Sequence, residues 1–153
     1  MFATNKRPVP AGAAASSPSR LLVRLLADLG HTDFLHVAGD PSFASARNRR
    51  QAFLDTVGQL GARGRVVDGY WSGRSGYDAI KALPDDTAVT AVVAANHQVA
   101  TGVVRAALER GWRVPDDLSV RLGRYRDGPV RYAIAVNGGH RLEALPFAVD
   151  GHR

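Results

Sequence analysis

A polar triplet, Asn96-His97-Gln98, directly follows the apolar run of residues 91–95 and directly precedes small residues typical of a helix. An asparagine side chain carries both a hydrogen-bond donor and an acceptor, so Asn96 can bind the hydroxyl groups of a ligand. Asparagine is also strongly preferred at the N-cap of a helix. The triplet therefore has two interpretations, a ligand contact and a helix cap, and one strand-to-helix turn can accommodate both.

Tyr77 and Lys81 have the Y-x-x-x-K spacing of the catalytic pair of short-chain dehydrogenases. They would share one helix face, where the lysine could lower the tyrosine pKa. Such an enzyme also needs a G-x-G-x-x-G turn near its start, and the chain has none. The five histidines show no metal-ligand spacing, and no G-x-S-x-G nucleophile motif is present. We therefore expect an ordinary helix pair here and no enzyme, cofactor or metal; the dehydrogenase is kept as the alternative.

The residue pattern predicts the elements that must position these side chains. Helices are expected near residues 19–29, 45–60, 75–83 and 98–110, and strands near residues 33–38, 65–71, 88–95 and 117–122. In the second helix, Phe53, Val57 and Leu60 are expected to face the core. Alternating helices and strands predict the α/β class, with a parallel sheet flanked by helices. Ligands of such sheets bind at the carboxyl ends of the strands, which is where Asn96 falls.

The two ends of the chain differ from its centre. Residues 1–18 are rich in Ala, Pro and Ser and are expected to be a flexible lead-in to an α/β unit over residues 19–122. Residues 123–153 form a divergent basic tail, in which two strands could flank the turn Asn137-Gly138-Gly139 as a β-hairpin. The net charge of +6 comes from residues 1–20 and 121–153, while the residues between them are balanced. This distribution weakens a nucleic-acid interpretation.

The composition, with 45% hydrophobic and 22% charged residues, is that of a soluble globular protein. There are no cysteines, so disulfides and thiolate chemistry are excluded. No apolar run is long enough to span a bilayer, and no convincing signal peptide is present. We therefore expect a cytoplasmic protein without a membrane partner.

Four segments follow one another in a specific order and spacing: LADLGHTDFLHVAGD, SARNRRQAF, GYWSGRSGYDA and VTAVVAANHQVATGVVRAALERGWRVPDDLSV. Together they resemble the effector-binding domain of the LacI/GalR family of bacterial transcription regulators. The resemblance covers about residues 20–120 and implies the C-terminal subdomain of a periplasmic-binding-protein-like (type I) fold. The helix-turn-helix headpiece and most of the first subdomain of that family have no counterpart in this sequence.

The resemblance also implies a binding site for a small-molecule effector, a sugar or a related compound. Arg49 matches an arginine that hydrogen-bonds the effector, Trp71 an aromatic residue that packs against it, and Asn96 an asparagine that contacts it. The family binds operator DNA, but this chain carries no DNA-binding motif of its own. Two further alternatives remain. The chain could form a homodimer, or it could be a non-sensing fragment that pairs with a related regulator through helix faces near residues 77–83 and 99–108.

Two departures from the family pattern stand out. His97 occupies a position that is usually aspartate, and histidine is a poorer partner for a helix N-terminus. After residue 120, RLGRYRDG replaces the family turn whose aspartate contacts the effector. A diverged ending is one explanation, and a truncated or frame-shifted gene is the hypothesis that we favour. Family-like sequence in another reading frame of the underlying DNA would support it, and the absence of such sequence would contradict it.

Overall fold

The computed structural model describes residues 18–124, 131–136 and 141–145, with side chains described for residues 19–122. Its six strands are β1 (Asp33–Val37), β2 (Arg63–Val67), β3 (Ala91–Ala94), β4 (Ser119–Arg124), β5 (Arg131–Val136) and β6 (Arg141–Leu145). Its helices are α2 (Pro18–Asp28), α3 (Ala44–Gln59), α4 (Gly73–Lys81) and α5 (His97–Glu109). Within this part of the chain, no helix combines the length and the apolar character that a bilayer crossing requires.

The strands form one sheet in the order β2-β1-β3-β4-β5-β6. The first four pair in parallel, which confirms the predicted α/β class with helices flanking a parallel sheet. β5 pairs antiparallel with β4, and β6 antiparallel with β5, so the same sheet continues past residue 124. The turn expected at residues 137–139 lies outside the described residues.

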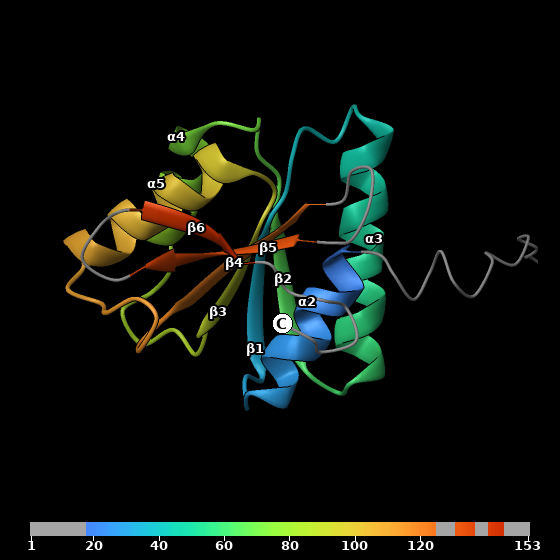
Figure 1. Cartoon of the computed structure of the whole chain (residues 1–153), viewed down its shortest axis with the longest axis horizontal. Helices are drawn as coiled ribbons and strands as arrows, with labels where there is room; N and C mark the ends of the chain where they lie inside the picture. The colour runs from blue at the N-terminus through green and yellow to red at the C-terminus, as the bar shows by residue number, and fades with distance from the viewer. Residues whose placement is uncertain (1–17, 125–130, 137–140, 146–153) are drawn as a thin grey trace, which may run out of the picture.

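Helices cover both faces of the sheet, with α2 and α3 on one side and α4 and α5 on the other (Figure 1). Successive side chains of a strand point to opposite faces of the sheet, so β1 contributes side chains to the core on both faces. Phe34 packs in the cluster under α2 and α3, whereas Leu35 and Val37 pack in the cluster under α4 and α5. A strand buried on both faces must be apolar throughout, and all four residues of β3 are buried.

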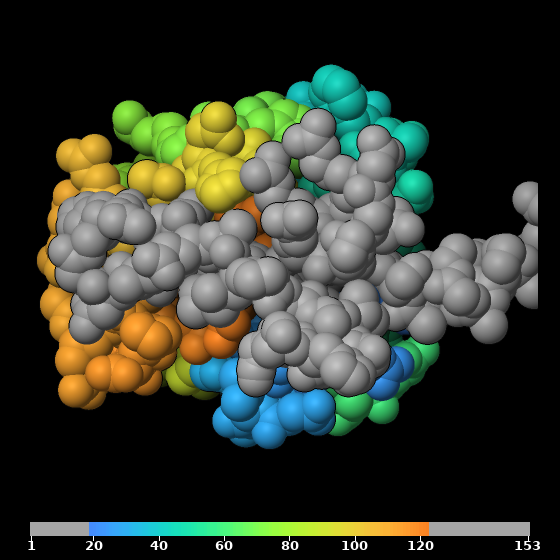
Figure 2. All heavy atoms as spheres, in the orientation of Figure 1, coloured from blue at the N-terminus to red at the C-terminus, as the bar shows by residue number. Residues whose placement is uncertain are grey.

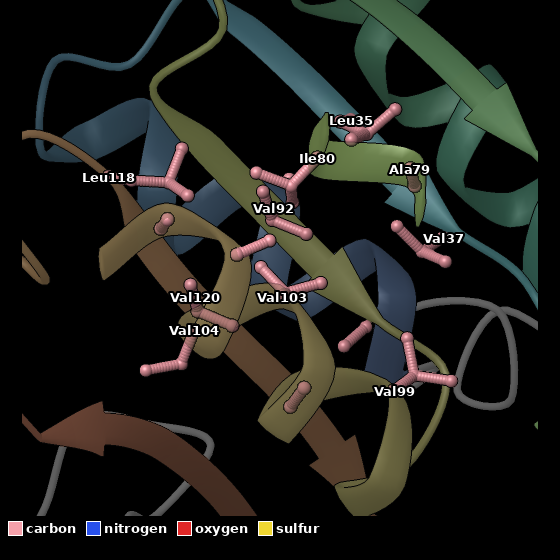
Figure 3. Close-up of a cluster of buried hydrophobic side chains, with 14 of the residues drawn as sticks. Leu35, Val37, Ala79, Ile80, Val92, Val99, Val103, Val104, Leu118 and Val120 are labelled. Carbon is pink, nitrogen blue, oxygen red and sulfur yellow. The ribbon is translucent and has the colours of Figure 1, made fainter. Parts of the chain in front are cut away.

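The larger core cluster lies between the sheet and the helices α4 and α5. Figure 3 shows its aliphatic side chains, including Val92 of β3 and Val99 and Val103 of α5, filling the space between strands and helices. The two helices approach each other closely because Gly76 and Gly102 lie at their contact. A Cβ atom at either position would overlap the backbone of the other helix.

Two sequence expectations are wrong at the ends of elements. The strand expected at residues 65–71 ends at Val67, and the chain bends at Trp71 and Ser72, so Trp71 lies in a loop. Leu60, expected to face the core, is 40% exposed because it is the C-cap of α3 and lies beyond the last helical residue.

Candidate functional site

Three loops meet at the carboxyl edge of the parallel sheet. They follow β1, β2 and β3 and lead into α3, α4 and α5, respectively. In a parallel sheet, the loops that follow adjacent strands lie side by side, and ligands bind there. Asn96 and Trp71 lie in two of these loops, and Arg49 lies on the helix that follows the third.

Asn96 is the N-cap of α5 and also links two loops. Its Oδ1 atom accepts a hydrogen bond of 2.9 Å from the Val99 backbone N–H, which satisfies a donor that the helix leaves free. Its Nδ2 atom donates a hydrogen bond of 3.1 Å to the Trp71 backbone carbonyl. The predicted cap is therefore confirmed, while the ligand contact stays a prediction.

Trp71 has an unusual backbone conformation for an aromatic residue. Its φ angle of 65° lies in the left-handed region, where a bulky residue costs on the order of 1–3 kcal/mol. The indole lies directly over Gly39 in the loop after β1, and any side chain at Gly39 would overlap it. The ring also meets the Phe43 ring edge-on, with 6.2 Å between the ring centroids and an interplanar angle of 89°. The conformation of the loop after β2 thus brings Trp71 onto the loop after β1.

Arg49 is half-buried on α3 and reaches the loop after β3. Its Nη1 atom donates a hydrogen bond of 3.1 Å to the Ala95 backbone carbonyl. No carboxylate among the described residues forms an ion pair with it, and burial lowers the pKa of its guanidinium below the usual range. A half-buried arginine without a carboxylate partner retains donors for a ligand hydroxyl or anion.

These contacts bring the three predicted residues together. Arg49 bonds to Ala95, which precedes Asn96 in the chain, and Asn96 bonds to Trp71. The partners are separated by 46 and 25 residues, respectively, so only the folded sheet edge unites them. His97 is the first residue of α5, next to this cap.

Phe43 is a residue of this edge that the sequence analysis missed. It occupies the N-cap of α3, where its side chain can make no capping hydrogen bond, and the residue is 54% exposed. Replacing a polar N-cap by an apolar residue costs about 0.5–2 kcal/mol. An apolar residue directly before a predicted helix is the signal that could have identified it.

A buried histidine lies beneath the edge, on β1. The Nδ1 atom of His36 is 2.9 Å from the Val93 carbonyl, which assigns the proton to Nδ1. The Nε2 atom is buried and has no hydrogen-bond partner, and the imidazole packs on the Phe53 ring at 5.2 Å between centroids. Burial lowers the pKa of His36 from 6.5 to about 4, so this side chain is neutral at physiological pH.

The Tyr77 hydroxyl does not have the environment of a catalytic tyrosine. It donates a hydrogen bond to Glu109 of α5, and this bond raises the pKa of Tyr77 above its usual range. Lys81 lies 3.5 Å from the same carboxylate, between its Nζ atom and the Glu109 Oε1 atom. A dehydrogenase pair requires the opposite shift in the tyrosine pKa, so this geometry does not favour that alternative.

Comparisons with known proteins point to one family. The model of the periplasmic binding protein-like domain matches residues 23–128. The HTH-type transcriptional repressor PurR of Pasteurella multocida is 33% identical over 104 residues, which is 65% of this chain and 31% of the relative. The HTH-type transcriptional regulator DegA of Bacillus subtilis is 34% identical over 98 residues, covering 62% of this chain and 29% of that protein. The chain thus spans about a third of the length of these curated relatives.

Solved structures agree with this result. A LacI family transcriptional regulator from Bifidobacterium animalis subsp. lactis superposes with a TM-score of 0.64 at 31% identity, covering 69% of this chain and 40% of that one. A dimeric Lac repressor with an 11-residue C-terminal deletion gives a TM-score of 0.64 at 33% identity, with the same coverage of 69% and 40%.

Proposed function

The chain belongs to the periplasmic-binding-protein-like domains of the LacI family of transcription regulators, and on this premise we propose that the carboxyl edge of its parallel sheet senses a small-molecule effector. The observation that carries the proposal is the connected set Arg49, Asn96 and Trp71 at that edge. The relatives are transcription regulators, and no enzymatic step is assigned to these residues.

Each of the three residues has a distinct role in the proposed site. The Arg49 guanidinium offers its remaining donors to hydroxyl groups of the effector, which is a sugar or a related compound. The Trp71 ring packs against the apolar face of the effector. Asn96 connects the loops after β2 and β3 through its hydrogen bond to the Trp71 carbonyl. The second N–H of its amide and the second lone pair of Oδ1 are offered to the effector. Because Arg49 bonds to the residue before this cap, an effector that engages Arg49 acts directly on the start of α5.

Effector binding tests the role of Arg49. We expect the chain to bind at least one compound of a sugar and nucleoside panel weakly, and Arg49→Ala to weaken this binding about tenfold because a hydrogen bond to a charged donor is lost. Titration followed by NMR chemical shifts measures the affinity. The matched control is Arg24→Ala, which removes an arginine of α2 that donates to Gln59, the last residue of α3. If no compound binds, or if the two variants lose affinity equally, the proposal fails.

We also propose that the outer face of α4 and α5 pairs with a second copy of the chain or with a related regulator. Both helices lie together at the molecular surface (Figure 2), and a hollow of about 490 Å³ opens between them. The hollow is lined by Gly73, Arg74, Tyr77, Thr101, Gly102 and Arg105. The lining combines small residues with long side chains such as those of Arg74, Tyr77 and Arg105, which can contact another helix.

Reversing one charge at this hollow tests the pairing. Arg105 lies 3.4 Å from the Glu109 carboxylate, and Arg105→Glu places two like charges one helical turn apart on the proposed interface. We expect the chain to form dimers in light scattering after size exclusion and this variant to shift at least tenfold toward monomer. Arg24→Glu, on α2, should leave the distribution unchanged. A wild-type chain that stays monomeric alone and with a full-length relative contradicts the proposal.

A further inference from the structure

Two aromatic side chains lie at the carboxyl edge in positions that local backbone preferences disfavour. The helices α4 and α5 begin with the polar caps Ser72 and Asn96, each of which accepts a backbone hydrogen bond. By contrast, α3 begins with Phe43, which accepts none through its side chain. Trp71 adopts a positive φ angle that favours glycine. Residues that disfavour their own backbone conformation or helix cap, with no stabilising contact to compensate, concentrate at functional sites.

The apolar N-cap Phe43 and the positive φ angle of Trp71 together bring two aromatic rings into contact. Phe43 comes from the loop after β1 and Trp71 from the loop after β2, and their rings meet at right angles with centroids 6.2 Å apart. Gly39 leaves room for the indole, which fills the space where any other residue would place its side chain. About half of the Phe43 residue surface stays exposed, although a polar residue would cap the helix better. The result is an aromatic corner, formed by Phe43 and Trp71, at the edge that also holds Arg49.

We propose that Phe43 is a specificity-determining residue of the effector site, and that the aromatic corner selects effectors carrying a flat unsaturated ring. This inference rests on the proposed function of the same edge. A planar ring can stack on one aromatic face of the corner while contacting the edge of the other ring. A sugar alone offers only C–H groups to one of these rings.

The polar groups of the edge support this choice. The Asn96 side chain already bonds to Val99 and to Trp71, and one Arg49 nitrogen already bonds to Ala95. Hydroxyl groups of a ligand therefore find part of the hydrogen-bonding capacity in use, whereas the exposed aromatic surface is unoccupied by the described side chains. A ligand with a ring gains more from this edge than a ligand with hydroxyl groups only.

The experiment titrates the full chain with adenosine, free adenine, an aryl galactoside, ribose and galactose, and follows NMR chemical shifts. The test variant is Phe43→Ser, which removes the ring and installs the cap residue that α4 uses at Ser72. The matched control is Leu29→Ser, which removes a 60% exposed apolar side chain just beyond α2, before the start of β1 and away from the carboxyl edge. Thermal unfolding of both variants checks that the fold is kept, and Phe43→Ser should be at least as stable as the parent.

We expect the ring-bearing ligands to bind at least tenfold more tightly than ribose and galactose. Phe43→Ser should remove most of this preference, while Leu29→Ser should retain it; adenine and the aryl galactoside separate a heterocyclic base from a simple aryl ring. Equal binding of sugars and ring-bearing ligands, or a preference that survives in Phe43→Ser, overturns the inference and leaves the effector site in place. Binding of none of the five compounds overturns the proposed function together with the inference.

Discussion

Replacing Gly102 by alanine is expected to lower the free energy of unfolding by about 3 kcal/mol or more. The added Cβ atom would overlap the Gly73 carbonyl oxygen of α4, and Gly76→Ala would likewise overlap the Val99 carbonyl oxygen of α5. Backbone atoms cannot rotate away as a side chain can, so the two helices must separate. Chemical denaturation of each variant measures the loss.

The matched control is Gly58→Ala, within α3. No atom outside its own helix turn lies within 4 Å of a Cβ atom built there, and alanine is the better helix former by about 1 kcal/mol. Gly58→Ala should therefore be neutral or stabilising. Equal losses in Gly102→Ala and Gly58→Ala would contradict the role of close helix packing in this fold.

The second large effect is a loss of stability in acid through His36. Its pKa is about 4 in the folded chain and about 6.5 when unfolded, because burial disfavours the imidazolium and Arg49 and Arg50 repel it. The unfolded chain therefore binds a proton at pH values where the folded chain does not. Stability from this group is complete above pH 6.5, falls as the pH decreases from 6.5 to 4, and is about 3 kcal/mol lower below that range.

Denaturation curves between pH 7 and pH 4 test this effect. His36→Leu removes the titrating group, so the parent should lose about 3 kcal/mol more than this variant over the range, whatever the absolute stability of the variant. Carboxylates with lowered pKa values, such as those of Asp33 and Asp117, are present in both proteins and cancel in the comparison. Parallel pH profiles for the two proteins would contradict a buried neutral histidine.

Local signals predicted much of the fold. The apolar run at residues 91–95 predicted a doubly buried strand, and β3 is one. Glycines marked helix ends correctly, since Gly30, Gly61 and Gly111 all have positive φ angles just after helices. The sequence pattern predicted the wrong end of a strand where the end depends on the position of that strand in the sheet. The aromatic residues Tyr70 and Trp71 resembled the end of a longer strand, but β2 is the edge strand and ends at Val67, and the Trp71 indole lies over Gly39 instead.

The site was predictable only in part, for a similar reason. The preference of asparagine for N-caps predicted the cap at Asn96. The bond from Asn96 to Trp71 and that from Arg49 to Ala95 depend on which strands are neighbours, which periodicity does not reveal. Phe43 was missed because its one local signal, an apolar residue at a helix start, says nothing about a ligand; its partner ring is 28 positions away in the sequence.

The most direct test of the central claim is to map the residues whose backbone amide signals shift when adenosine is added to the isotope-labelled chain. If the carboxyl edge is the effector site, the largest shifts will occur in the loops at residues 39–43, 68–72 and 95–97. The opposite edge of the sheet offers a competing hollow of about 640 Å³, lined in part by Asp33, Arg63 and Val89. Shifts confined to that hollow, or to the outer face of α4 and α5, would contradict the claim.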